Sequence, residues 1–598
     1  MKIKALVSGI LAGAAILVAL PPASARADDE MPIMPLSEIK AGMTGEWHTV
    51  VSGTRIDSFP MVVVGIADNF IGPQRPVIIC KGLDATNILT GPVAGMSGSP
   101  VFINGKLIGA YAYGFILPKE QDLFGVTPIE QMLEVESNYP PTTIPAGTTA
   151  LAEMNTASDP QWLSAPVATT GVPTLTTLQS AMKPLPTPLF VSGVSEQVLE
   201  KFASRLNALG LQVMQAPSGS APAHSFDTNL EPGSAVSGVL MSGDFDFAGT
   251  GTVTWRHGNR ILAFGHPFLQ SGPTDMPMAP AEIITVVQGY LESFKLPNIG
   301  PVVGTIYQDR LTGIAGEIGR MPDTTHVEVH LDAPGGKTRL FQGDLFQNQM
   351  ISPILSAIAL LESIYATMEL EENQTIYMDT TMEVAGYKPV QLSDAASGDG
   401  GGFELAINQL MLYDSLLNNP CKFPDVKSLT FHVRMVDGVK SSWLDSLNLD
   451  RNEVRPGTTL HAVIGLRNYH GEPSAIPVSI PIPADLHAPE MELFVGDADA
   501  AQQMDEPPVP PQTLAQVLDR IRQTRSHQDI CVKLLEDTPG VAVEGKNLPD
   551  LPPSVVAQFE SPNASSQQAT LNRVTLWETN FPVAGTFSGQ MTLPVRIK

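Results

Sequence analysis

Cysteine is scarce in this sequence. Among 598 residues there are three cysteines, Cys80, Cys421 and Cys531, and their spacing fits neither a zinc site nor a disulfide-rich scaffold. Cys80 ends the apolar stretch 77–80 and is predicted to be a buried free thiol. Cys421 and Cys531 are hypothesised to form a disulfide, which an exported protein can keep.

Motifs that bind cofactors are also missing. The sequence has no HExxH zinc motif, no GxxxxGK phosphate loop and no Rossmann glycine run after a strand. We therefore expect no cofactor and no metal.

Positively charged residues are few, with 35 Lys and Arg against 61 Asp and Glu and a net charge of −26. Such a surface repels nucleic acid and anionic lipid, so neither is expected as a partner.

Long apolar runs are confined to the N-terminus. Lys2 and Lys4 precede the apolar run 5–20, and the small-residue site Ala25-Arg26-Ala27 follows it. This pattern is typical of a secretory signal peptide over residues 1–27, and an uncleaved anchor is the alternative. We expect a periplasmic or extracellular protein with no integral membrane segment after cleavage.

The remaining chain has the pattern of a mainly β protein. Short apolar strands alternate with turn residues, and with 43% hydrophobic residues the chain can bury several cores. The expected division is a first β unit (28–137), a connector with a small α/β insert (138–232), a second β block (233–390), a helix plus β-sandwich module (391–506) and a C-terminal α+β segment (507–598).

The most informative motif is Gly95-Met96-Ser97-Gly98-Ser99-Pro100. Glycines permit the tight turn that lifts a serine hydroxyl clear of the backbone and aims main-chain N–H groups at an oxyanion. Ser97 is the candidate nucleophile, and the amides of Gly95 and Ser97 are the candidate oxyanion-hole donors. The hairpin signal Asn104-Gly105 then predicts that the serine lies at the rim of a β-barrel. The six residues alone also fit a plain structural turn.

A serine hydroxyl needs a base that takes its proton. Of the eleven histidines, His266 stands at the end of an apolar strand, in Phe264-Gly265-His266-Pro267, where the chain turns sharply. It is the candidate general base, although a loop histidine without chemistry fits the same local pattern. His48 is the competitor, because it precedes the serine as the base does in trypsin.

Two segments carry a family resemblance. GMSGSPVFINGKLIGAYAYG resembles the stretch around the active serine of trypsin-like peptidases. Together with GTGTVTWRHGNRILAFGHP, it resembles the SpoIVB family of sporulation-signalling serine peptidases. The resemblance covers residues 34–136 and 233–320 and implies a trypsin-like double β-barrel peptidase core, with Ser97 and His266 as the catalytic pair. The two segments stand in reversed order relative to that family, as though the serine-bearing half (28–137) and the histidine-bearing half (233–390) were permuted.

A third group, a carboxylate, would hold the imidazole in a triad. Asp84 lies thirteen residues before Ser97, near where the family carries an acidic residue. Asp309 is the alternative, because it belongs to the same half as His266. Each also fits an ordinary turn or strand-end aspartate.

These features predict an exported serine endopeptidase that hydrolyses peptide bonds through an acyl-enzyme, with a protein or peptide as substrate. The alternative is a catalytically inactive protein that has kept the peptidase fold and serves as a binding or adhesion protein of the periplasm or cell surface. The sequence gives no prediction of oligomeric state or cleavage specificity.

Overall fold

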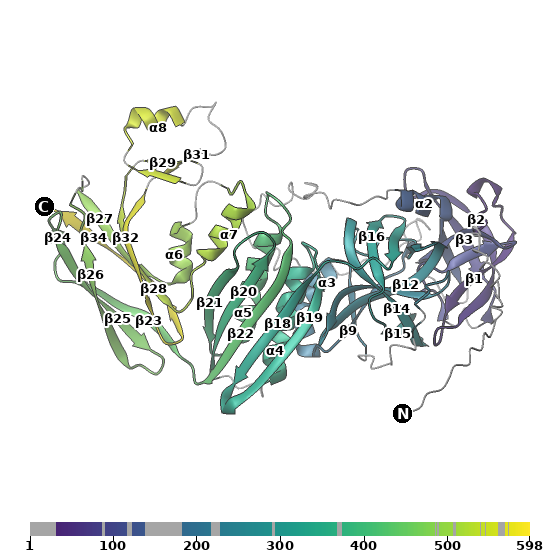
Figure 1. Ribbon diagram of the computed structural model, residues 1–598, viewed down its shortest axis with the longest axis horizontal. Helices are drawn as coiled ribbons and strands as arrows, with labels where there is room; N and C mark the ends of the chain where they lie inside the picture. The colour runs from purple at the N-terminus through teal and green to yellow at the C-terminus, as the bar shows by residue number, and fades with distance from the viewer. Residues whose placement is uncertain are drawn as a thin grey trace, which may run out of the picture.

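The computed structural model describes most of the chain after residue 30. The described residues are 31–85, 90–115, 122–137, 182–216, 226, 228–289, 293–367, 373–484, 486, 489–505, 510–538, 540–543, 546–549, 551–559, 568–571 and 573–598. The expected signal peptide and most of the expected connector lie outside them. Two barrels, a helix-covered sheet and a sandwich follow one another along the long axis, from the N-terminal to the C-terminal end (Figure 1).

The first barrel is a closed antiparallel ring of six strands. Its order is β5-β1-β2-β3-β7-β6, and β6 pairs with β5 to close it. Apolar residues on alternate positions fill the interior, with Trp47 and Tyr111 among the largest buried side chains. The short helices η1 (Leu36–Glu38) and α2 (Ile129–Ser137) flank the ring. The six strands are β1 (Thr44–Val50), β2 (Ile56–Gly72), β3 (Arg75–Gly82), β5 (Pro100–Ile103), β6 (Lys106–Phe115) and β7 (Leu123–Pro128).

The second barrel is another ring of six paired strands. Its order is β12-β13-β17-β16-β14-β11, and β11 pairs with β12 to close it. On its outside β9 and β10 extend the sheet from β12, and β15 pairs with β14. The strands are β9 (Pro188–Ser192), β10 (Gln212–Gln215), β11 (Ala235–Gly243), β12 (Asp246–His257), β13 (Arg260–Ala263), β14 (Gly272–Val287), β15 (Ser293–Ile299), β16 (Gly304–Arg310) and β17 (Gly313–Ile318).

The two barrels are joined by backbone pairing as well as by side chains. Strand β15 of the second barrel pairs in parallel with β4 (Val93–Ala94), which leads directly into the Ser97 turn. A further bridge joins Gly53 to Ile283, and β8 (Met182–Pro184) lies on β6. The mainly β, double-barrel core expected from the sequence is therefore confirmed.

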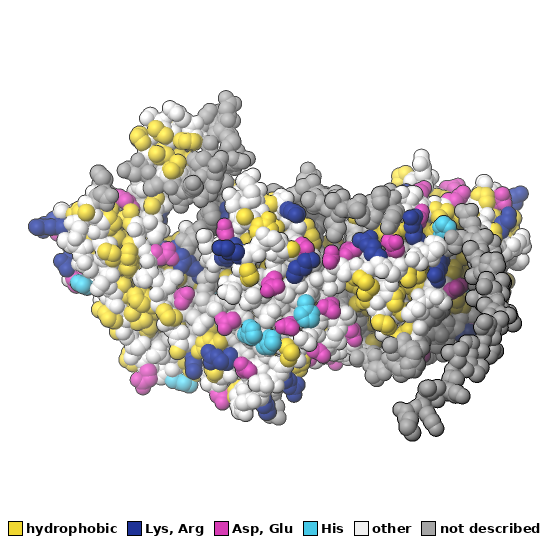
Figure 2. Space-filling model, in the orientation of Figure 1, with side chains coloured by type: hydrophobic (Ala, Val, Ile, Leu, Met, Phe, Trp, Pro, Cys, Tyr) yellow, Lys and Arg dark blue, Asp and Glu magenta, His cyan; other side chains and the backbone are white. Residues whose placement is uncertain are grey.

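A twisted sheet continues from the second barrel through β11, which pairs with β19. Helices α3 and α4 pack on one another, and α4 and α5 cover the sheet and are buried deeply in the core. The opposite face is exposed, and histidines gather on it over β18 and β22 (Figure 2). The sheet runs on past residue 390, where a boundary was expected, because β22 pairs with both β18 and β20. Its elements are β18 (Thr324–Ala333), η6 (Pro334–Gly336), β19 (Lys337–Phe346), β20 (Gln374–Val384), β21 (Val390–Ser397), β22 (Val426–Asp437), α3 (Glu196–Ala208), α4 (Ser352–Thr367) and α5 (Gly401–Leu417).

The C-terminal part is a two-sheet sandwich around one apolar core. One sheet has the order β26-β25-β23-β33 and the other β24-β34-β27-β28-β32. Strands from residues 507–598 therefore complete the sandwich that begins before residue 506. Its elements are β23 (Ser441–Leu449), β24 (Glu453–Val454), β25 (Thr459–Asn468), β26 (Pro473–Pro481), β27 (Glu490–Gly496), α6 (Ala498–Asp505), α7 (Leu514–Arg522), β28 (Asp529–Glu536), β32 (Val574–Pro582), β33 (Thr586–Ser588) and β34 (Gln590–Ile597). A small appended sheet holds β29 (Gly540–Val543), β30 (Lys546–Pro549), β31 (Gln568–Leu571) and helix α8 (Pro553–Phe559).

The hypothesised disulfide is wrong, because all three cysteines are free. Cys421 packs beside the core of the helix-covered sheet, and its Sγ donates to the carbonyl of Pro511 at 3.4 Å. Cys531 is buried in a different cluster inside the sandwich. Cys80 is the buried free thiol that its apolar strand predicted. Within the described part of the chain, no helix combines the length and the apolar character that crossing a bilayer requires.

Candidate active site

Ser97 lies in a tight turn between β4 and β5. Gly95 and Gly98 on either side of it have φ angles of 91° and 97°, which favour glycine. A Cβ on Gly98 would stand 1.9 Å from the carbonyl oxygen of Thr252, so the second barrel leaves no room for a side chain there. The amide and hydroxyl of Ser99 both donate to the carbonyl of Met96, at 2.9 and 2.6 Å, and close the turn.

The amides of this turn fall into two groups. Those of Met96, Gly98 and Ser99 donate to backbone carbonyls at 2.8 to 3.1 Å. The amides of Gly95 and Ser97 donate to no other described residue. Two neighbouring N–H groups without acceptors can bind an oxyanion, which is the role that the sequence motif predicts for them.

His266 follows an abrupt reversal at the end of β13. Phe264 and Gly265 have φ angles of 71° and 72°, and the hydroxyl of Thr127 donates to the carbonyl of Gly265 at 2.6 Å. A Cβ on Gly265 would lie 2.8 Å from the Cβ of Ala110 on β6, so the two barrels touch at this point. The reversal directs the imidazole toward the first barrel.

The structure brings Ser97 and His266 together across 169 positions of sequence. The Nε2 of His266 lies 2.8 Å from the Oγ of Ser97, and its Nδ1 lies 2.8 Å from the carbonyl oxygen of Pro267. A carbonyl only accepts hydrogen bonds, so Nδ1 carries the proton and Nε2 accepts from the serine hydroxyl. Both side chains are 2% exposed. Burial lowers the pKa of His266 to about 4, so the ring is neutral at neutral pH.

Two threonines of β12 hold the serine turn, and sequence reasoning did not identify them. The amide of Thr252 donates to the carbonyl of Ser97 at 2.8 Å, and its hydroxyl donates to the carbonyl of Gly95 at 3.1 Å. The hydroxyl of Thr254 donates to the carbonyl of Gly98 at 2.7 Å. Threonines at alternate positions in GTGTVTW were the available signal, because alternate residues of a strand share one face.

The structure brings neither candidate acid to the imidazole. Asp309 is fully buried and accepts hydrogen bonds from the amides of Phe268, Leu269 and Ser271 at 2.8, 2.7 and 3.2 Å. It therefore fixes the loop that presents Pro267 rather than the ring itself. Asp84 lies near Asp122, whose pKa is raised to about 6 by burial and then by the charge of Asp84. The place that a carboxylate would fill is occupied by the Pro267 carbonyl.

His48 does not approach Ser97. It lies on β1, where its Nε2 is 3.1 Å from a carboxylate oxygen of Glu46 and its ring packs on Phe102 at 4.8 Å between centroids. The chain order of trypsin would make it the base, but its hydrogen-bond partner is an exposed glutamate on the same strand.

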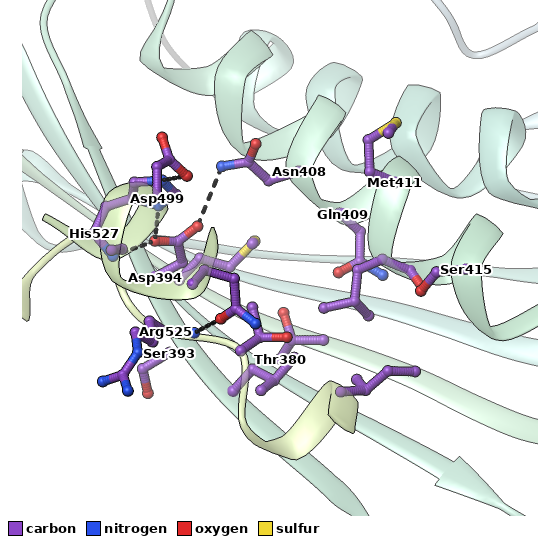
Figure 3. A pocket seen from close by; sticks show the side chains of 17 residues that line it. Thr380, Ser393, Asp394, Asn408, Gln409, Met411, Ser415, Asp499, Arg525 and His527 are labelled. Atoms are coloured by element: carbon purple, nitrogen blue, oxygen red, sulfur yellow. Dashed lines mark hydrogen bonds and ion pairs between the residues drawn. The ribbon is translucent and has the colours of Figure 1, made fainter. Parts of the chain in front are cut away.

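A cavity of about 310 Å³ lies far along the chain from this pair, where α5 and β21 meet the segment after α7 (Figure 3). Several polar groups on its wall form hydrogen bonds and ion pairs. Asp394 accepts from Nδ1 of His527 at 2.8 Å and from Asn408 at 3.4 Å, and Arg525 pairs with Glu578. These contacts join the helix-covered sheet to the sandwich, so the cavity lies at the interface between these two parts.

Ser97 and His266 thus meet between two six-stranded β-barrels, within hydrogen-bond reach of one another. Residues 15–133 match the family model described as SpoIVB peptidase S55, which confirms the resemblance noted from the sequence. The match includes Ser97 and ends before the His266 segment, and it indicates a serine peptidase. Neither the curated proteins nor the solved structures contain a match to this chain.

Proposed function

We propose that the protein is an exported serine endopeptidase in which Ser97 is the nucleophile and His266 the general base. The observation that carries this proposal is the 2.8 Å contact between Ser97 Oγ and His266 Nε2, beside two amides for which the described residues offer no acceptor. The family match over the serine segment supports the reaction class. The N-terminal sequence pattern supports export to the periplasm or the extracellular space.

The reaction follows from these positions. Ser97 Oγ bonds to the substrate carbonyl carbon while its proton moves to Nε2 of His266, and the carbonyl π electrons move onto oxygen. The amides of Gly95 and Ser97 hold that oxyanion. When it collapses, the C–N bond breaks and the imidazolium gives its proton to the leaving amine. Water then attacks the acyl-enzyme by the same route and releases the acid.

Orientation of the base comes from the backbone. The Pro267 carbonyl keeps the proton on Nδ1, and Asp309 keeps the Pro267 loop in place through three amides. The arrangement is a Ser–His dyad with a positioned carbonyl, in which Asp309 is a positioning residue.

Labelling with a fluorophosphonate tests the proposal, because this reagent phosphonylates only an activated serine. The wild-type mature protein and His48→Ala are expected to label, and Ser97→Ala and His266→Ala are expected not to. Edman or mass-spectrometric mapping should find the adduct on Ser97. Labelling that survives in His266→Ala but disappears in His48→Ala would move the base to the first barrel.

A second function has two observations in its favour. Ser97 and His266 are both 2% exposed, and no carboxylate among the described residues bonds the imidazole. These features fit a peptidase fold kept as a binding or adhesion protein. Absence of labelling and of proteolysis at every pH from 5 to 9, with the protein folded, would favour that function.

A further inference from the structure

A lysine is buried beside the serine turn. Lys295 lies on β15, between Phe294 and Leu296, and is fully buried. Its ammonium donates to the hydroxyl of Thr49 at 2.6 Å and to the hydroxyl of Thr252 at 3.3 Å. None of the carboxylates in the described residues forms an ion pair with it. Among the described residues, its hydrogen-bond partners are these two hydroxyls.

A buried ammonium without an anion destabilises a fold, because the charge loses its hydration and gains no counter-charge. An apolar side chain of the same length would pack at this position without that cost. The stem of Lys295 already lies among apolar neighbours on a strand that pairs with β14 and β4. Packing alone therefore does not explain why a charged side chain occupies this position.

Lys295 contacts Gly95, which lies two positions before Ser97, both directly and through Thr252. Its stem lies against Gly95, where an added Cβ would be 3.2 Å from Lys295 Cβ and 3.4 Å from Cδ. Its ammonium binds the Thr252 hydroxyl, which in turn donates to the Gly95 carbonyl at 3.1 Å. On the N-terminal side of Gly95, Phe294 is the strand partner of Ala94. Lys295 and Thr252 together fix the orientation of Gly95.

We propose that Lys295 is a positioning residue of the oxyanion hole. Through Thr252 it holds the Gly95 amide toward the reacting carbonyl, and its positive charge lies behind the turn where negative charge develops on the substrate oxygen. This inference rests on the proposed peptidase function. The described residues give Lys295 no counter-charge, and the oxyanion supplies one, so the interaction strengthens as the transition state forms.

The surroundings of Lys295 leave its charge sensitive to pH. The groups facing it are the hydroxyls of Thr49 on β1 and Thr252 on β12, the Gly95 backbone and, across the strand pair, Val286 on β14. The ionisable residues connected to these contacts are His48, which precedes Thr49 on β1, and His266, which bonds Ser97. Burial lowers the pKa of Lys295 to about 7.

The test compares three variants in the fluorophosphonate labelling rate and in the melting temperature. Lys295→Met keeps the stem and removes the charge, and Thr252→Val removes the hydroxyl that links Lys295 to Gly95. Both are expected to slow labelling by about 100-fold, the effect of losing one oxyanion-hole donor. Lys295→Met should melt no lower than the wild type, since it removes a buried charge.

Ser293→Ala is the matched control. Ser293 lies two positions away on β15, is fully buried, and donates to the carbonyl of Thr90 at 2.7 Å. Its loss removes a buried hydrogen bond from the same strand without touching the Gly95 turn. Labelling within about threefold of the wild type is expected, because this substitution removes neither an oxyanion-hole group nor the general base.

Three outcomes would overturn the inference. Lys295→Met labelling at the wild-type rate sinks the role of Lys295 and leaves the proposed function standing. A parallel loss of labelling and melting temperature, matched by Ser293→Ala, indicates a structural lysine only. Absence of labelling in the wild type removes both proposals together. If Lys295→Met does not fold, Thr252→Val decides, and a wild-type rate there counts against the link.

Discussion

The imidazole of His266 is oriented by the residue that follows it. Its Nδ1 lies 2.8 Å from the carbonyl oxygen of Pro267, where a serine triad has a carboxylate. A carbonyl fixes the tautomer but carries no charge, so it stabilises the imidazolium less than an aspartate does. Because burial dominates, the pKa of His266 falls, whereas a buried carboxylate neighbour would raise it.

Asp309→Asn is expected to weaken both stability and labelling. An amide cannot accept hydrogen bonds at its nitrogen, so at least one of the buried amides of Phe268, Leu269 and Ser271 loses its acceptor. The free energy of unfolding, measured in urea, should fall by about 2–4 kcal/mol. Asp84→Asn, on the first barrel, should change the labelling rate by less than about twofold; a loss larger than that of Asp309→Asn would restore Asp84 as the acid.

The labelling rate is expected to have two pH limbs. It should rise as pH increases through about 4, because His266 must be neutral to accept the proton of Ser97. It should fall as pH increases through about 7, because Lys295 then loses its charge. Lys295→Met should keep the acid limb and lose the alkaline one. An alkaline limb unchanged in that variant would assign it to another group.

Gly98→Ala is expected to prevent stable packing of the two barrels. The added Cβ would meet the Thr252 carbonyl at 1.9 Å, at a φ of +97°. The free energy of unfolding should fall by about 4 kcal/mol or more, because backbone atoms and not a flexible side chain must move. Gly105→Ala is the control: its φ is +72°, yet nothing lies within 4 Å, so only the conformational cost of about 1–2 kcal/mol applies. Equal decreases in the free energy of unfolding of Gly98→Ala and Gly105→Ala, measured in urea, would contradict the clash.

His527 should make the stability of the interface between the helix-covered sheet and the sandwich pH-dependent. Its hydrogen bond with Asp394 raises the pKa of His527 from 6.5 to about 9. The stabilisation is complete below about pH 6.5 and is lost as pH rises through about 9. Its size should be roughly 1–3 kcal/mol, reduced by partial solvent screening. The slope of unfolding free energy over this window should vanish in His527→Gln and persist in His461→Ala, an exposed histidine of the sandwich.

The serine turn could be predicted from sequence because its geometry is local. Gly95, Gly98 and the Asn104-Gly105 hairpin carry their φ requirements in their own residue types. The mainly β character followed from the alternation of apolar residues, and the core of two barrels followed from the family-like segments.

The rest of the site lies in contacts that sequence does not display. Any residue offers a carbonyl, so nothing marked Pro267 as the partner of Nδ1. Asp309 was placed at the imidazole because it is an acid in the right half, but its oxygens are used by three backbone amides. Thr252 and Lys295 act on a turn more than 150 positions earlier, and only folding reveals that they meet it.

The order of the two halves has a consequence for biosynthesis. The serine is made 169 residues before its histidine, and the threonines and lysine that hold its turn come from the later half as well. A nascent chain that has completed only the first barrel carries an inert hydroxyl. Under the proposed function, Ser97 becomes reactive only when the second barrel closes against the first, so a partly synthesised chain does not cleave peptides.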